Sequence, residues 1–87
     1  MYNYQTEKQN LLTDEGQRTL IKVRDHVLKT LKISGAMTMG AAMDAADSGD
    51  SWIMMAYVDR LVELGDIREI KQGEVAGQYR IFVATRG

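Results

Sequence analysis

The chain has 87 residues, which is room for one domain, and it has no cysteine, which excludes disulfides, thiolate metal sites and cysteine nucleophiles. Hydrophobic residues make up 45% and charged residues 26% of the sequence, a composition typical of globular proteins rather than disordered chains. The net charge is −1, but residues 33–66 hold one basic and six acidic residues, and the segments on either side are basic. The N-terminal residues lack the pattern of a signal peptide, and charges interrupt every apolar stretch. We therefore expect a cytoplasmic protein with no membrane partner.

The N-terminal third of the sequence predicts a polar segment followed by a long helix. Residues 1–12 are polar apart from two tyrosines and a leucine pair, so we expect either a flexible arm or a short docking segment. Thr13 is a good helix cap, and the apolar residues that follow recur at helical spacing as far as Lys32. Gly35 marks the turn after this helix.

The rest of the chain predicts two more helices and at least two strands. Thr38 can cap a short second helix, and Asp50 or Ser51 can cap a third helix that runs from Trp52 to Leu64. Gly65 follows in the position that favours a left-handed backbone. Residues 67–70 and 78–84 have the composition of strands. Residues 13–87 are therefore predicted to form one α+β domain, with three helices followed by a two- or three-stranded antiparallel sheet.

This order of elements resembles a winged helix-turn-helix domain over residues 13–84. The most specific part is the run YVDRLVELGDI, residues 57–67, which is similar to the end of the recognition helix in bacterial regulators of the multiple-antibiotic-resistance type. The resemblance implies a small winged helix-turn-helix fold and a DNA-binding transcriptional regulator, usually dimeric, with its third helix in the major groove of double-stranded DNA.

The third helix itself has two faces when its residues are projected at about 100° per residue. We expect the inward face to hold Ile53, Met54, Tyr57, Val58, Leu61 and Leu64. The outward face holds Trp52, Met55, Ala56, Asp59 and Glu63, with Arg60 and Val62 at its margin. Helices that read DNA present hydrogen-bond donors at their start, and carboxylates facing phosphates are repelled. This helix is therefore predicted to be a poor reader of the groove.

Two functions follow, which differ in the surface that they use. If the domain binds DNA, basic residues of the first helix and the wing should contact phosphates, with the candidate residues Arg18, Lys22, Lys29, Ser51, Arg60, Lys71 and Arg80. If it is instead a protein-interaction module with little or no DNA binding, the third helix should contact a second copy or a protein partner through Trp52, Met55, Ala56 and Asp59. Alternatively, Trp52 folds back on the N-terminal arm or the wing and completes the core.

No pattern in the sequence predicts an enzyme. His26, the one histidine, falls off the apolar stripe of its helix and is predicted to be a solvated surface residue. The acidic residues Asp44, Asp47 and Asp50 are spaced like cation ligands but lack the closing glycine and glutamate of a calcium loop, so we expect helix caps and a turn. We accordingly expect no catalytic residue, metal or cofactor.

Overall fold

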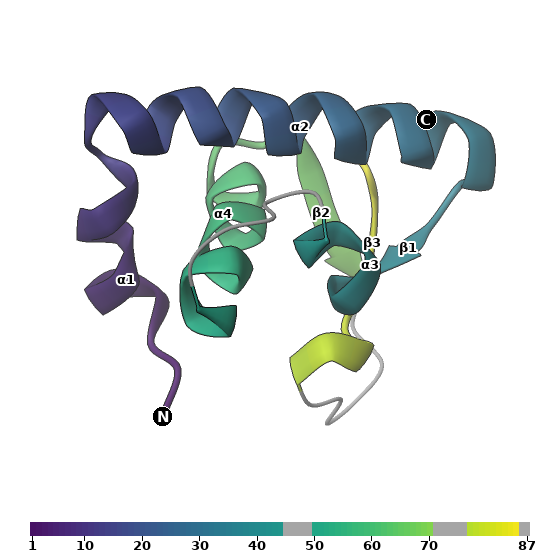
Figure 1. Ribbon diagram of the computed structural model, residues 1–87. Coiled ribbons are helices and arrows are strands. Elements are labelled where there is room, and N and C mark those ends of the chain that lie inside the picture. Colours follow the sequence, from purple (N-terminus) through teal and green to yellow (C-terminus); the bar gives the residue numbers. More distant parts are fainter. Residues whose placement is uncertain (45–49, 71–76, 86–87) are drawn as a thin grey trace.

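The structure is a computed structural model that describes residues 1–44, 50–70 and 77–85. Within these residues the chain forms four α-helices, one short 3-10 helix and a three-stranded sheet (Figure 1). In chain order the elements are α1 (Tyr4–Leu11), α2 (Asp14–Ser34), β1 (Met37–Thr38), α3 (Met39–Met43), α4 (Ser51–Glu63), β2 (Ile67–Ile70), η1 (Gly77–Tyr79) and β3 (Ile81–Ala84). The α+β class that the sequence predicts is confirmed.

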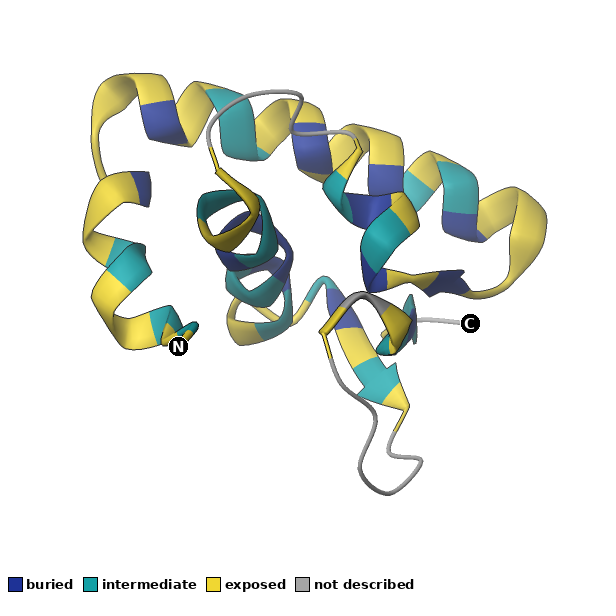
Figure 2. Cartoon of the chain, turned by 60° about the horizontal axis from the view of Figure 1, so that its bottom comes forward, coloured by how far each residue is buried: buried dark blue, intermediate teal, exposed yellow. Residues whose placement is uncertain are grey.

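Helix α2 spans the molecule and covers the other elements on one side (Figure 1). Its start is set by Thr13, whose hydroxyl oxygen accepts a hydrogen bond from the backbone N–H of Gly16 at 3.0 Å, as predicted. It ends at Gly35, which has a φ of +81°. Val23, Val27 and Leu31 are buried on one side, and Figure 2 shows the opposite side of the helix exposed along its length.

Helices α3 and α4 begin at side-chain caps. Thr38 accepts a hydrogen bond from the backbone N–H of Ala41 at 3.2 Å, and Asp50 accepts one from that of Ile53 at 2.9 Å. Of the two caps predicted for α4, Asp50 is therefore the one used. Gly65, just beyond the end of α4, has a φ of +85°, which confirms the predicted left-handed turn.

The sheet has the strand order β1-β3-β2, and both pairings are antiparallel. In the central strand, Phe82 pairs with Met37 on one side and with Glu69 on the other. The first and last strands differ from prediction. β1 has two residues, too few for a pattern of alternation to reveal it, and β3 begins at Ile81 rather than at residue 78 because Gly77–Tyr79 forms η1.

One hydrophobic core joins the helices to the sheet. It contains residues from every helix α1 to α4 and from all three strands, namely Leu11, Val23, Val27, Leu31, Met37, Met39, Ala42, Ala56, Tyr57, Val58, Leu61, Ile67 and Phe82. Of the inward face predicted for the third helix, Tyr57, Val58 and Leu61 are buried, whereas Ile53 and Met54 are half-buried. However, the prediction that Leu64 faces inward is wrong, since it is 50% exposed just after the helix ends.

The N-terminal segment is helical and packed. Helix α1 packs against α4, and Leu11 at its end is buried in the core. The turn between α1 and α2 is tight, because a Cβ atom on Gly16 would lie 2.6 Å from the carbonyl oxygen of Leu11. Glycine at this position therefore permits the close approach of the two helices.

Candidate functional site

An exposed apolar patch lies at the start of α4. We define the Trp52 patch as Ser51, Trp52 and Met55. Met55 lies four residues after Ser51 and three after Trp52, so the three side chains are neighbours on the surface of the helix. Trp52 is 44% exposed and Ser51 is also exposed, whereas Met55 is half-buried against the core. Trp52 has thus not been absorbed into the core, which was the alternative interpretation of this residue.

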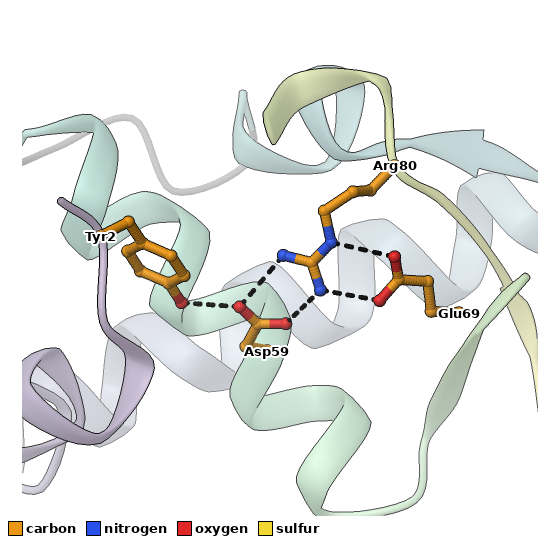
Figure 3. Close-up of polar contacts among 4 residues, drawn as sticks. All are labelled: Tyr2, Asp59, Glu69 and Arg80. Carbon is orange, nitrogen blue, oxygen red and sulfur yellow. Dashed lines mark hydrogen bonds and ion pairs between the residues drawn. The ribbon is translucent and has the colours of Figure 1, made fainter. Parts of the chain in front are cut away.

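The face of α4 beside this patch is covered by the N-terminal segment. The tyrosyl hydroxyl of Tyr2 donates a hydrogen bond of 2.6 Å to Asp59 (Figure 3). Burial, and then the hydrogen bond to Asp59, raise the pKa of Tyr2 above its ordinary value, so the residue stays a neutral donor. Asp59, predicted to be an exposed contact residue, is therefore half-buried and bonded within the chain.

One turn further along α4, Glu63 is held in the same way by α1. It accepts a hydrogen bond of 2.7 Å from the hydroxyl of Tyr4 and forms ion pairs with Lys8 at 3.0 Å and Arg60 at 2.6 Å. The hydrogen bonds from Tyr4, Lys8 and Arg60 lower the pKa of Glu63 to about 2. Arg60, a candidate phosphate ligand, is thus paired with a carboxylate on its own helix.

Arg80 occupies the centre of a second ionic cluster, which joins α4 to the sheet. Its guanidinium donates to both oxygens of Asp59, at 2.8 and 3.3 Å, and to both oxygens of Glu69, at 2.8 and 3.0 Å (Figure 3). These bonds, those to Glu69 first, raise the pKa of Arg80 above its ordinary value despite partial burial. The guanidinium carbon also lies 5.3 Å from the ring centre of Phe82.

This pairing differs from the role predicted for Arg80. The sequence places it at the wing as a free phosphate ligand, but two carboxylates surround its one positive charge, and its side chain is only 18% exposed. A phosphate there would have to displace a bidentate carboxylate and would meet net negative charge. Lys71, the other wing candidate, lies outside the described residues.

The remaining basic candidates lie on α2. Arg18, Lys22 and Lys29 are all exposed, and their spacing places them on one side of the helix, opposite its buried residues. That side faces away from the elements beneath α2, among them η1 and the start of β3 (Figure 1). The described residues therefore do not join the basic residues of α2 and Arg80 into one surface.

The prediction that Ala56 lies on an outward face is wrong. It is 0% exposed, because α1 packs against α4 in addition to α2, α3 and β2. The helical projection in the sequence analysis assumes that the third helix packs on one side only, whereas α4 has other elements packed against several of its sides. Of the predicted contact residues, Trp52 and part of Met55 remain accessible.

The residues that sequence reasoning missed are the tyrosines and the lysine of the N-terminal segment. Tyr2, Tyr4 and Lys8 each bond to a carboxylate of α4. The signal lies in the spacing of Asp59 and Glu63, four residues apart on one helix face, opposite a polar segment with two phenols. Carboxylates facing outward can thus be ligands for a docked arm.

Three further features concern metal binding, membrane insertion and the single histidine. Among the described residues, no group of three or more His, Cys, Asp or Glu side chains could hold a metal ion. No helix in the described part of the chain combines the length and apolar character needed to cross a bilayer. His26 is exposed on α2, as predicted.

In comparisons with known proteins, no family model, curated protein or solved structure matches this chain.

Proposed function

We propose that the chain is a winged-helix domain. The order α2, β1, α3, α4, β2, β3 supports this fold, as does a sheet in which the last strand lies between the other two. In such a domain α3 and α4 correspond to the helix-turn-helix pair, and β2 and β3 to the wing. The side-chain caps that begin α2, α3 and α4, and the turn at Gly65, support the same proposal because they delimit the helices in this order.

We further propose that the domain is a protein-interaction module that docks through the Trp52 patch. The observation that carries this proposal is the exposure of Trp52, 44%, at the start of the helix that would otherwise read DNA. A large exposed aromatic side chain next to a methionine is the usual composition of an interface anchor. The neighbouring face of α4 supports the same function, because α1 covers it and its carboxylates are engaged within the chain.

DNA binding is the second candidate, and one observation favours it. The exposed residues Arg18, Lys22 and Lys29 form a basic row on α2, and the winged-helix resemblance implies a DNA-binding regulator. A row of this kind contacts phosphates without reading bases. This candidate therefore predicts association that is independent of DNA sequence and strongly dependent on salt.

A titration with DNA separates the two candidates. The protein-interaction proposal expects weak, sequence-independent binding to random and genomic duplexes, and no effect of Trp52→Ala on it. Tight binding that falls steeply with salt, and that is lost when Arg18, Lys22 and Lys29 are replaced by Glu, would establish DNA binding instead. Each phosphate contact contributes about −0.9 to the slope of log affinity against log salt, so the slope counts the contacts.

A photo-crosslinker at position 51 tests the protein-interaction proposal directly. Ser51 is exposed beside Trp52, so a crosslinking amino acid placed there should capture the docked partner in the native cells. We expect the crosslinked protein to disappear in Trp52→Ala and to remain in Ile21→Ala, which removes an equally exposed apolar side chain from α2. A crosslink that is indifferent to Trp52→Ala, or none at all, would contradict the proposal.

A further inference from the structure

A second apolar surface lies at the other end of α4, between α2 and the sheet. It is a groove of about 590 Å³ whose floor holds Leu28, Leu31, Val83 and Ala84. A smaller hollow lined by Leu64 and Asp66 adjoins it, since both hollows share Leu28 and Ala84. We call the first of these hollows the α2–β3 groove. The apolar side chains that line it are not fully covered by the rest of the chain.

Two cations line this groove. Lys32 and Arg68 both lie at its edge, and neither forms an ion pair with the residues that the structure describes. A symmetric contact of the groove with the same groove of a second copy would bring like charges together, which is unfavourable. The occupant that the groove favours therefore combines an apolar side chain with a carboxylate.

The Trp52 patch together with the neighbouring Asp50 has this composition. Trp52 is a large exposed apolar side chain, and Asp50 two residues before it is exposed and carries a negative charge. Its carboxylate caps α4 through the backbone N–H of Ile53, and it forms no ion pair with the described residues. The two surfaces are thus complementary in charge, and both present apolar area.

The two surfaces cannot meet within one molecule. Trp52 lies at the start of α4, a helix of 13 residues. The groove adjoins the hollow at Leu64, just past the end of this helix. A helix of this length separates the two by about 18 Å. Figure 1 shows the first turn of α4 on the side of the molecule away from α2.

From this arrangement we propose that the partner of the Trp52 patch is a second copy of this chain, whose α2–β3 groove receives Trp52 in a head-to-tail contact. The inference rests on the proposed protein-interaction function and names its partner. Each copy keeps one free Trp52 patch and one free groove, so the contact propagates into short chains or closes into a ring. One aromatic anchor buries far less area than a stable dimer needs, so the association is weak and depends on concentration.

Sedimentation velocity over micromolar to millimolar concentrations tests the proposal. We expect wild type to form species larger than a monomer as concentration rises. Trp52→Ala and Arg68→Glu should each lower the association constant by at least about tenfold. Ile21→Ala is the matched control, since it changes a similarly exposed apolar residue of α2 outside both surfaces and should associate like wild type.

Mixing the two defective variants is the decisive step. Trp52→Ala retains an intact groove and Arg68→Glu retains an intact Trp52 patch, so an equimolar mixture should form a dimer that cannot extend. A symmetric contact would not be restored in this way. Monomeric wild type throughout the range, or a mixture that stays monomeric, would overturn the head-to-tail contact.

The crosslink at position 51 distinguishes failure of this inference from failure of the proposed function. If wild type is monomeric but the Trp52-dependent crosslink to another protein persists, self-association is wrong and the interaction module stands. If both association and crosslink are absent, both proposals fail.

Discussion

Gly16 shows how a single hydrogen atom in place of a methyl group can determine the position of a helix. A Cβ atom there would lie within 3 Å of three backbone atoms of Leu11, and backbone cannot rotate away as a side chain can. The same glycine lies in the first turn of α2, where alanine would ordinarily be the better helix former. Local propensity and tertiary packing therefore oppose each other at this position.

The sign of the change in the free energy of unfolding caused by Gly16→Ala shows whether helix propensity or the clash dominates. Helix propensity alone predicts a gain of up to about 1 kcal/mol, whereas the clash predicts a net loss of about 1 kcal/mol or more in the free energy of unfolding. Urea denaturation measures it, with Gln17→Ala on the exposed side of the same turn as the control. A stabilised Gly16→Ala protein would mean that Leu11 does not approach α2 this closely.

Leu61 and Leu64 offer a matched pair at the end of α4. Leu61 is 0% exposed and Leu64 is 50% exposed, although helical spacing assigns both to the inward face. We expect Leu61→Ala to lower the free energy of unfolding by about 2–5 kcal/mol, through lost burial and a residual cavity. Leu64→Ala should cost less than about 1 kcal/mol. Equal costs in urea denaturation would show that α4 is rotated relative to this structure.

At the scale of elements, the contact between α1 and α4 depends on protonation at Glu63 and Tyr4. The hydrogen bonds from Tyr4, Lys8 and Arg60 lower the pKa of Glu63 from 4.5 to about 2. Stability from this carboxylate is therefore complete above pH 4.5 and is lost as the pH falls toward 2. Burial and the hydrogen bond to Glu63 raise the pKa of Tyr4 from 10.0 to about 12. The stability that the neutral phenol contributes to the fold is therefore lost as the pH rises from 10 toward 12.

We thus predict that α1 is most firmly docked on α4 at pH values between these two transitions, and that it detaches more readily at lower and at higher pH. An NMR titration that follows the side-chain carboxyl of Glu63 and the phenol of Tyr4 measures both transitions. Glu63→Gln keeps an oxygen acceptor but cannot titrate, so the acid transition should vanish in that variant. A Glu63 resonance that titrates near 4.5 in the wild type would show that α1 does not hold it.

The helices α2, α3 and α4 were the most predictable elements, because local chemistry sets where they begin and end. Thr13, Thr38 and Gly65 act where the sequence indicates, as caps and as a left-handed turn. The outcome at Ala56 was not predictable from α4 alone, since its burial depends on a helix from the other end of the chain. Likewise, the isolated segment Tyr4–Leu11 is too short to be a stable helix in water, so its helicity reflects docking.

At the scale of the whole molecule, the cluster around Arg80 joins segments that are far apart in sequence. Asp59 lies on α4, Glu69 on β2, Arg80 just before β3, and Tyr2 reaches Asp59 from the N-terminus. The candidate site could not be predicted here because the sequence shows Arg80 as a lone cation in the wing, 21 residues from Asp59. Only the folded chain shows that these charges are paired with one another.

Removing the cation should destabilise the whole domain. Arg80→Met keeps an apolar stem but leaves two carboxylates close together, so we expect a loss of about 1–3 kcal/mol in the free energy of unfolding. Asp59→Asn should lower the free energy of unfolding less in the Arg80→Met background than in the wild type. In that background the Asp59 carboxylate has already lost Arg80 as its partner. Thermal unfolding of the four proteins in this cycle provides the measurement. Additive effects would mean that the pair is not coupled.

The uneven attachment of α1 has a consequence for how the molecule fluctuates. Its final residue, Leu11, is fully buried in the core, whereas Tyr2 and Tyr4 are only partly buried against it. Together with Lys8, these tyrosines also bond to carboxylates of α4. Detaching α1 exposes less apolar area than unfolding the whole domain, so it costs less free energy than global unfolding. In native-state hydrogen exchange, the amides of α1 should therefore exchange through a partial opening while those of α2 and α4 stay protected. In that open state Asp59 and Glu63 become accessible for as long as α1 is detached, so α4 alternates between a covered and an acidic surface.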